Sequence, residues 1–210
     1  MKLSKTQLIV AMIFYGALWG IVEASVGYLL HFLPSLIAGT ILFPFAALIL
    51  SKAYQKCGSN WALLGVGFIA AAIKAFDFLL PVMNIFKVIN PMISIVLEAL
   101  MVFAVINVMN RSNVAHKIGA LFIASFGWRA LFLASFGIQL MISGYAAPQI
   151  QSLSAIADFI FLSGSLSAMI VLGLFMFDHL VSKKWNLVIT ITPLVSAITT
   201  AFAIILTLVL

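Results

Sequence analysis

The sequence predicts an all-α integral membrane protein: a bundle of about seven transmembrane helices, with six as the alternative, forming one transmembrane domain over residues 1–210. Of the 210 residues, 65% are hydrophobic and 8% are charged, whereas soluble domains are about 45–50% apolar and about 25% charged. The apolar runs reach the roughly 20 residues that a helix needs to cross a bilayer. Basic residues fall mostly between these runs, as membrane topology requires.

Seven apolar runs account for almost the whole chain: 7–32, 35–54, 61–80, 91–109, 118–143, 152–177 and 185–210. Helix-breaking or polar residues lie in the connections, namely Pro34, Gly58, Pro81, Asn110, Pro148 and Lys183. Pro44 and Pro193 lie inside runs, where we expect kinks because spanning helices tolerate proline. The connection 82–90 is partly amphipathic, which predicts a short interfacial helix or a lid.

The first run follows Lys2 and Lys5, as the apolar core of a signal peptide would. A signal core is about 7–15 residues long and precedes a small-residue cleavage site. The run 7–32 is longer and has no clear site of that kind. We therefore expect it to stay in the protein as the first transmembrane helix.

The distribution of lysine and arginine predicts the orientation. Eight basic residues fall on one side of the seven-helix topology: Lys2, Lys5, Lys52, Lys56, Arg111, Lys117, Lys183 and Lys184. Only Lys87 falls on the other side. Because cytoplasmic loops are enriched in basic residues, we expect a cytoplasmic N-terminus, an external C-terminus and a multi-pass location in the cell (plasma or inner) membrane. The net charge of +6 is explained in this way, and we expect no nucleic-acid partner.

Most of the acidic residues are predicted to lie inside the membrane. Four of the five, Glu23, Asp77, Glu98 and Asp158, belong to apolar runs, together with Lys74 and Arg129. A charge at the centre of a bilayer costs about 2.5–3.5 kcal/mol on insertion scales. These residues are therefore expected to face protein or water and to pair, as Lys74 and Asp77 can at a helical spacing of three.

In the predicted topology nearly all of these six charged residues lie in the outer half of the membrane. A shared depth favours a water-accessible pocket that is open to the outside, formed by Glu23, Asp77, Glu98, Asp158, Lys74 and Arg129. Trp19, Trp128 and His31 are further candidates for this site. The alternatives are a structural polar network, with Arg129 as a counter-ion to Asp158 or Glu98, and an interfacial histidine at position 31.

Other chemistries lack their residues in this sequence. It contains no glycine-rich phosphate loop with lysine, no histidine pair spaced by four and no Cys/His cluster of the kind that binds zinc. The single cysteine, Cys57, cannot form an internal disulfide. We therefore expect no metal site, no cofactor and no catalytic residues.

Small residues follow one face of the first helix. Gly16, Gly20 and Gly27 share this face with Glu23, because residues three and four apart lie on one side of a helix. Small residues allow another helix to approach closely.

Size, helix number, this small-residue stripe and the polar residues of the outer half together resemble the substrate-binding S-component of energy-coupling factor vitamin transporters. The resemblance spans the chain and is architectural. It implies a transmembrane coupling subunit and ATPase subunits as partners, with Gly16, Gly20 and Ala24 as the docking residues. Such S-components usually have six helices, and the seven predicted here depart from that number.

These observations predict a protein that captures a small polar, vitamin-like solute from outside, with uptake driven by an energising partner complex. The six predicted site charges sum to minus two, which favours a cationic or amine-bearing solute, and Trp19 and Trp128 could stack on a ring. The alternatives are a stand-alone proton- or ion-coupled carrier, an intramembrane enzyme acting on a lipid or isoprenoid, and a non-catalytic subunit of a larger membrane complex.

Overall fold

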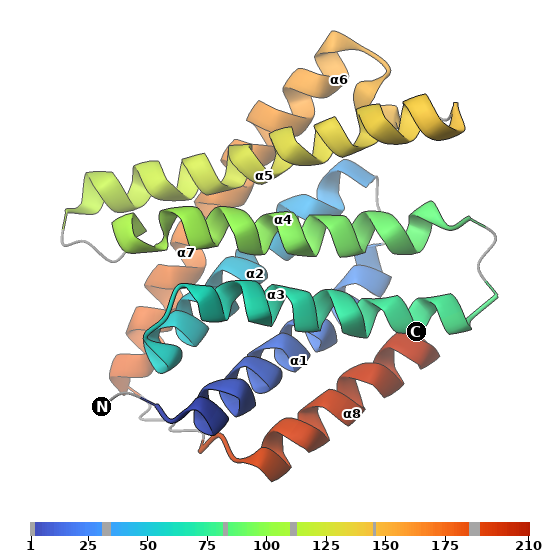
Figure 1. Ribbon diagram of the computed structural model, residues 1–210. Coiled ribbons are helices and arrows are strands. Elements are labelled where there is room, and N and C mark those ends of the chain that lie inside the picture. The colour runs from blue at the N-terminus through green and yellow to red at the C-terminus, as the bar shows by residue number, and fades with distance from the viewer. Residues whose placement is uncertain (1–2, 31–34, 82–83, 110–112, 145, 185–189) are drawn as a thin grey trace.

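Each apolar run forms a helix in the computed structural model, which describes residues 3–30, 35–81, 84–109, 113–144, 146–184 and 190–210. The long helices are α1 (Lys5–Leu30), α2 (Ser35–Cys57), α3 (Trp61–Lys74), α4 (Phe86–Met109), α5 (Val114–Ser143), α7 (Ser163–Lys184) and α8 (Pro193–Val209) (Figure 1). The 3-10 helix η1 (Ala75–Leu79) continues α3. The 3-10 turn η2 (Pro148–Ile150), the short helix α6 (Leu153–Ala157) and the π-helical turn η3 (Asp158–Leu162) lead into α7. The predicted all-α class with seven helical segments is confirmed within these ranges.

Five segments of the described chain are long and apolar enough to cross a membrane: Lys5–Leu30, Trp61–Leu79, Phe86–Met109, Val114–Ser143 and Leu153–Val181. The last helix, Pro193–Val209, is apolar but has only 17 residues. The chain is thus a multi-pass helical membrane protein. The number of crossings and the cytoplasmic N-terminus stay predictions.

Two helix starts differ from the prediction, both near prolines. Pro193 is the first residue of α8 instead of a kink within a longer helix, and Thr192 caps the helix by accepting a hydrogen bond from the Val195 amide. The missing N–H of proline costs nothing at a first helical position. Helix α4 begins at Phe86 instead of at Pro91, so the end of the predicted lid or interfacial helix belongs to α4.

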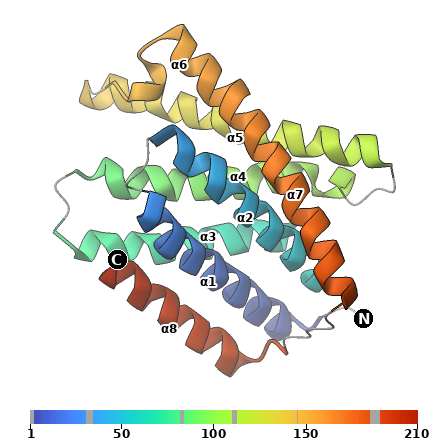
Figure 2. The ribbon, with the colours of Figure 1, turned by 180° about the vertical axis from the view of Figure 1, so that it is seen from behind.

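The helices pack as a row with two further helices behind it. In Figure 1 the row runs from α8 at the bottom through α1, α3 and α4 to α5 at the top, and consecutive members are in contact. Helices α2 and α7 cross on the other side of this row, as the reverse view shows (Figure 2). Helix α2 packs against α1 and α7, and α7 packs against α5. The core therefore lies between the row and the α2–α7 pair.

The small-residue stripe of α1 belongs to this interior. A Cβ at Gly16 would lie 2.6 Å from Ile69 Cγ2, and a Cβ at Gly20 would lie 3.0 Å from Ile73 Cγ2. Both glycines and Ala24 are buried. The chain's own helices cover these residues, and close approach of α3 explains the glycines. The docking of a separate subunit on Gly16, Gly20 and Ala24 stays a prediction.

Because successive long helices alternate in direction, α1, α3 and α5 end at the same end of the bundle, where α4 begins and the C-terminus lies (Figure 1). We call this the distal end, and it is the end that the basic residues predict to be external. Near the opposite end, Lys52 of α2 forms an ion pair with Asp178 of α7. Both of these side chains are about one-third exposed, at 36% and 33%.

Candidate solute-binding cavity

A cavity of about 410 Å³ lies toward the distal end. Residues of α1, α2, α3, α4, α5, η2 and η3 line it, together with Asn84 before α4. Ligand-binding pockets for small molecules typically measure about 300–1,000 Å³ and combine apolar walls with a few polar groups. The cavity has both properties, because acidic, basic, amide and aromatic side chains face it.

Two buried carboxylates line this cavity from different helices. Glu23 of α1 is 7% exposed and Glu98 of α4 is 3% exposed. Within the described ranges, the structure shows no hydrogen bond and no ion pair for either carboxylate. They are close enough to interact electrostatically with each other. A buried carboxylate without a hydrogen bond or ion pair is costly, so these two groups are the least satisfied polar side chains that line the cavity.

Lys74 and Asp77 form the ion pair that their spacing predicts. Lys74 Nζ lies 2.7 Å from Asp77 Oδ2, where α3 passes into η1. Lys74 lines the cavity, and Asp77 lines an adjoining one of about 360 Å³ that also contacts Tyr28 and Thr207. Asp77 therefore neutralises a cation of the cavity wall and does not itself line the main cavity.

Arg129 lies behind the cavity wall and does not line it. It is fully buried, and its guanidinium donates to the Ser125 backbone oxygen at 2.8 Å, to Ser125 Oγ at 2.9 Å and to the Gly39 backbone oxygen at 3.1 Å. Ser125 Oγ in turn donates to the Gly164 carbonyl. Arg129 thus joins α5 to α2 directly and to α7 through Ser125, and it interacts electrostatically with Glu98.

The guanidinium of Arg129 also supports an aromatic wall. Its Cζ lies 4.5 Å from the ring centroid of Trp128, a cation–π distance. Trp128, Phe132 and Phe136 follow one face of α5 at a spacing of four, and Phe159 joins them from η3. Ring centroids are 6.0 Å apart for Trp128–Phe132 and 4.5 Å apart for Phe132–Phe136. The rings present a continuous aromatic surface to the cavity.

Gly39 makes room for the Trp128 side chain, and the indole nitrogen of Trp128 has no hydrogen-bond acceptor in the described chain. A Cβ at Gly39 would lie 2.9 Å from Trp128 Cη2, so glycine makes room for the indole. Trp128 is 1% exposed, and its Nε1–H finds no acceptor among the residues that the structure describes. The wall therefore holds an unused hydrogen-bond donor.

The entrance of the cavity is polar and was not predicted as part of the site. Asn84, Lys87, Asn90 and Ser94 line it from the first turns of α4 and the residues before them. Asn84 and Lys87 are exposed, and the Asn90 side chain accepts a hydrogen bond from Gln139 of α5. In the sequence, the polar residues of the connection 82–90 indicate the entrance of the cavity. The spacing of four between Trp128, Phe132 and Phe136 indicates the aromatic wall.

The structure gathers part of the predicted site and separates the rest. Glu23, Glu98, Lys74 and Trp128 line the cavity, Asp77 lies beside it and Arg129 lies behind it. Trp19 is a core residue at 1% exposure, near Gly67 of α3, and lines none of these cavities. His31 lies outside the described residues.

Asp158 lies apart from this cavity. It starts the π-helical turn η3, its side chain is exposed, and it does not line the cavity, although the next residue, Phe159, does. Its predicted role in the site stays a prediction. The formal charges that line the cavity, Glu23 and Glu98 against Lys74 and Lys87, sum to zero. The predicted set, which includes Asp77, Asp158 and Arg129, sums to minus two.

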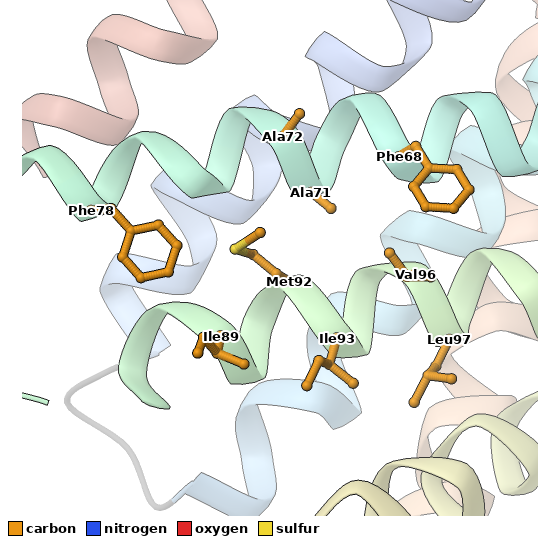
Figure 3. A pocket seen from close by; sticks show the side chains of 9 residues that line it. All are labelled: Phe68, Ala71, Ala72, Phe78, Ile89, Met92, Ile93, Val96 and Leu97. Atoms are coloured by element: carbon orange, nitrogen blue, oxygen red, sulfur yellow. The ribbon is translucent and has the colours of Figure 1, made fainter. Parts of the chain in front are cut away.

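A further hollow of about 500 Å³ lies between α3 and α4 and has a different character (Figure 3). The side chains that line it are all apolar, among them Phe68, Phe78, Met92 and Leu97. It offers no charged group to a polar solute and has the chemistry of a lipid-facing surface.

The described residues contain no group of three or more histidine, cysteine, aspartate or glutamate side chains that could hold a metal ion. Comparisons with protein-family models, with curated proteins and with solved structures found no match. The functional argument therefore rests on the geometry of the cavity.

Proposed function

We propose that this membrane protein binds a small polar solute in the distal cavity and mediates its uptake across the membrane. One observation carries the proposal: two carboxylates, Glu23 and Glu98, are more than nine-tenths buried and line a cavity of about 410 Å³ without a hydrogen-bond or ion-pair partner in the described chain. A bound solute would provide the partner that the protein lacks.

The contrast with the other charges supports a binding role over a purely structural network. Lys74 is paired with Asp77, Lys52 is paired with Asp178, and Arg129 has three hydrogen bonds. Charges that hold a bundle together are expected to be satisfied in this way, because an unpaired buried charge opposes folding. Glu23 and Glu98 do not follow that pattern, and they are the charges that line the cavity.

The energy source is a separate part of the proposal. The resemblance to S-components favours a transmembrane coupling subunit with ATPase subunits. The second candidate is a stand-alone proton-coupled or ion-coupled carrier. The proximity of Glu23 and Glu98 favours it, because neighbouring carboxylates inside a membrane are common proton relays.

Binding is tested first, with the purified full chain in detergent. Small molecules released by denaturing the protein are identified by mass spectrometry for the wild type, Glu98→Gln and Asp158→Asn. We expect a solute with the wild type and with Asp158→Asn, and its loss with Glu98→Gln. Asp158→Asn is the matched control, because it removes the same charge outside the cavity. Equal recovery from all three proteins would contradict the proposed site.

Transport is then measured with the purified chain alone in proteoliposomes. Uptake that depends on a proton gradient would identify the stand-alone carrier. Binding without uptake is expected if a partner complex supplies the energy.

A further inference from the structure

We propose that the solute is a small organic cation that carries an aromatic ring, with its charge held between Glu23 and Glu98 and its ring against the wall formed by Trp128, Phe132, Phe136 and Phe159. This inference rests on the proposed function and names the substrate class of the same cavity.

The first step concerns where the negative charge lies. The cavity has no net charge, but its charges are separated by depth: Glu98 and Glu23 are 3% and 7% exposed, whereas Lys87 at the entrance is exposed. The basic groups near the carboxyls make their short contacts elsewhere. Lys74 pairs with Asp77 at 2.7 Å, and Arg129 is hydrogen-bonded to Ser125 and Gly39 behind the wall. The deep end of the cavity therefore has two carboxyl groups without a hydrogen bond or ion pair in the described chain, and a bound cation would pair with their ionised form.

The second step concerns the wall opposite this charge. The four rings lie within 4.5–6.3 Å of their neighbours, measured between centroids, and form one surface from α5 to η3. Aromatic faces attract cations within about 6 Å and stack on other rings. A cavity of about 410 Å³ has the volume for a molecule with one or two rings.

The third step concerns hydrogen bonding. Trp128 lines the cavity, and its indole Nε1–H has no acceptor in the described chain. A buried donor without an acceptor costs about 1–3 kcal/mol. The Nε1 atom is enclosed by protein, so the wall selects the ring of a solute by its aromatic faces and not by this donor.

Other classes of solute fit fewer of these features. An anion would bring a third negative charge beside Glu23 and Glu98, which is unfavourable at low dielectric. An inorganic cation would leave the aromatic wall unused, and the described residues contain no three-ligand metal cluster. An aliphatic cation would satisfy the carboxylates and leave the aromatic wall without a ring to stack on.

The test measures the thermal unfolding of the purified full chain in detergent. A small-molecule extract of the source cells is separated by ion exchange into cationic, neutral and anionic fractions, and each fraction is added to the protein. We expect only the cationic fraction to raise Tm, and the compound recovered from the protein to absorb in the near ultraviolet. A rise with the neutral or anionic fraction alone would overturn the cationic class and leave the proposed function standing. If no fraction raises Tm, the proposed function fails as well.

Variants then locate the compound from the stabilising fraction. Glu98→Gln, or Glu23→Gln if the former does not fold, should weaken its apparent Kd by about tenfold or more, because a charge-assisted contact is lost. Asp158→Asn should leave Kd unchanged. Phe132→Leu should weaken binding several-fold, whereas Phe14→Leu, a buried phenylalanine of α1 that does not line the cavity, should not. Equal effects of Glu98→Gln and Asp158→Asn would overturn the charge contact, and equal effects of the two phenylalanine variants would overturn the ring contact.

Discussion

Buried polar side chains of this protein divide by what they contact. Lys74 forms an ion pair and Arg129 donates three hydrogen bonds within the chain, whereas the structure shows no hydrogen bond or ion pair for Glu23 and Glu98 within the described residues. Buried atoms without a hydrogen-bond partner there include Trp128 Nε1 and Arg129 Nε. In a membrane protein this difference matters more than burial, because neither lipid nor a dry core can satisfy such groups. In the proposed function, Glu23 and Glu98 are the groups that the solute satisfies.

Arg129 is expected to stabilise the fold through the shape of its guanidinium. Arg129→Lys keeps the charge but loses the planar fork that donates to both Ser125 and Gly39. We expect it to lower the free energy of unfolding by about 2–4 kcal/mol, since buried hydrogen bonds to a charged group are lost.

The control for Arg129→Lys is Lys52→Gln, which breaks an ion pair whose side chains are about one-third exposed and should cost about 0–1 kcal/mol. Thermal unfolding in detergent measures both variants. Equal stability of Arg129→Lys and the wild type would show that charge alone is needed at this position.

Close contact between α1 and α3 explains why α1 has glycine at position 16. A Cβ at Gly16 would lie 2.6 Å from Ile69 Cγ2, 2.7 Å from Ile69 Cβ and 3.0 Å from the Val66 carbonyl oxygen. The Ile69 Cβ and the carbonyl belong to or adjoin the backbone, so they cannot move away cheaply. Helices α1 and α3 are thus held at a separation that only glycine allows.

Gly16→Ala is therefore expected to reduce the yield and Tm of the folded protein. Alanine is favoured over glycine in a helix by about 1 kcal/mol, but the clash with α3 should outweigh this gain. Gly137→Ala is the matched control, because a Cβ at Gly137 of α5 meets nothing within 4 Å. It should leave Tm unchanged or raise it. A Gly16→Ala protein as stable as the control would contradict this packing role and leave docking as the explanation of the stripe.

At the scale of the whole molecule, the alternating helices bring the predicted outer halves of α1, α3, α4 and α5 together at the distal end. The cavity opens at this end, and the loop charges predict that this end is external. A solute-binding cavity that opens outward would allow capture before uptake, as the proposed function requires.

The orientation can be tested with the single native cysteine. Cys57 ends α2 at the end opposite the cavity and is partly exposed, whereas Gln151 is exposed in the connection before α6 at the distal end. In intact cells a membrane-impermeant maleimide should not label Cys57 but should label Gln151→Cys in a Cys57→Ser background. Permeabilised cells should show labelling of both proteins. The reverse pattern in intact cells would contradict the cytoplasmic N-terminus.

The sequence by itself determined the class of this protein, its helical segments and the charged residues that need an explanation. Long apolar runs can only be helices in lipid, because every backbone polar group must be satisfied within the segment. The pairing of Lys74 with Asp77 also followed from the sequence, since residues three apart lie on one helix face. These features depend on local spacing and on transfer from water to lipid.

Only the tertiary structure decided which of those residues meet. It brought Glu23 of α1 and Glu98 of α4 to one cavity, placed Arg129 behind Trp128, and buried Gly16 and Gly20 against α3. It also left Asp158 exposed at the start of η3 and placed Phe132, Phe136 and Phe159 along one wall of the cavity. Depth along a helix can be estimated from the sequence, but the direction of a side chain around the helix axis depends on which neighbours pack against it. Contacts between distant segments set that direction, and local spacing does not contain them.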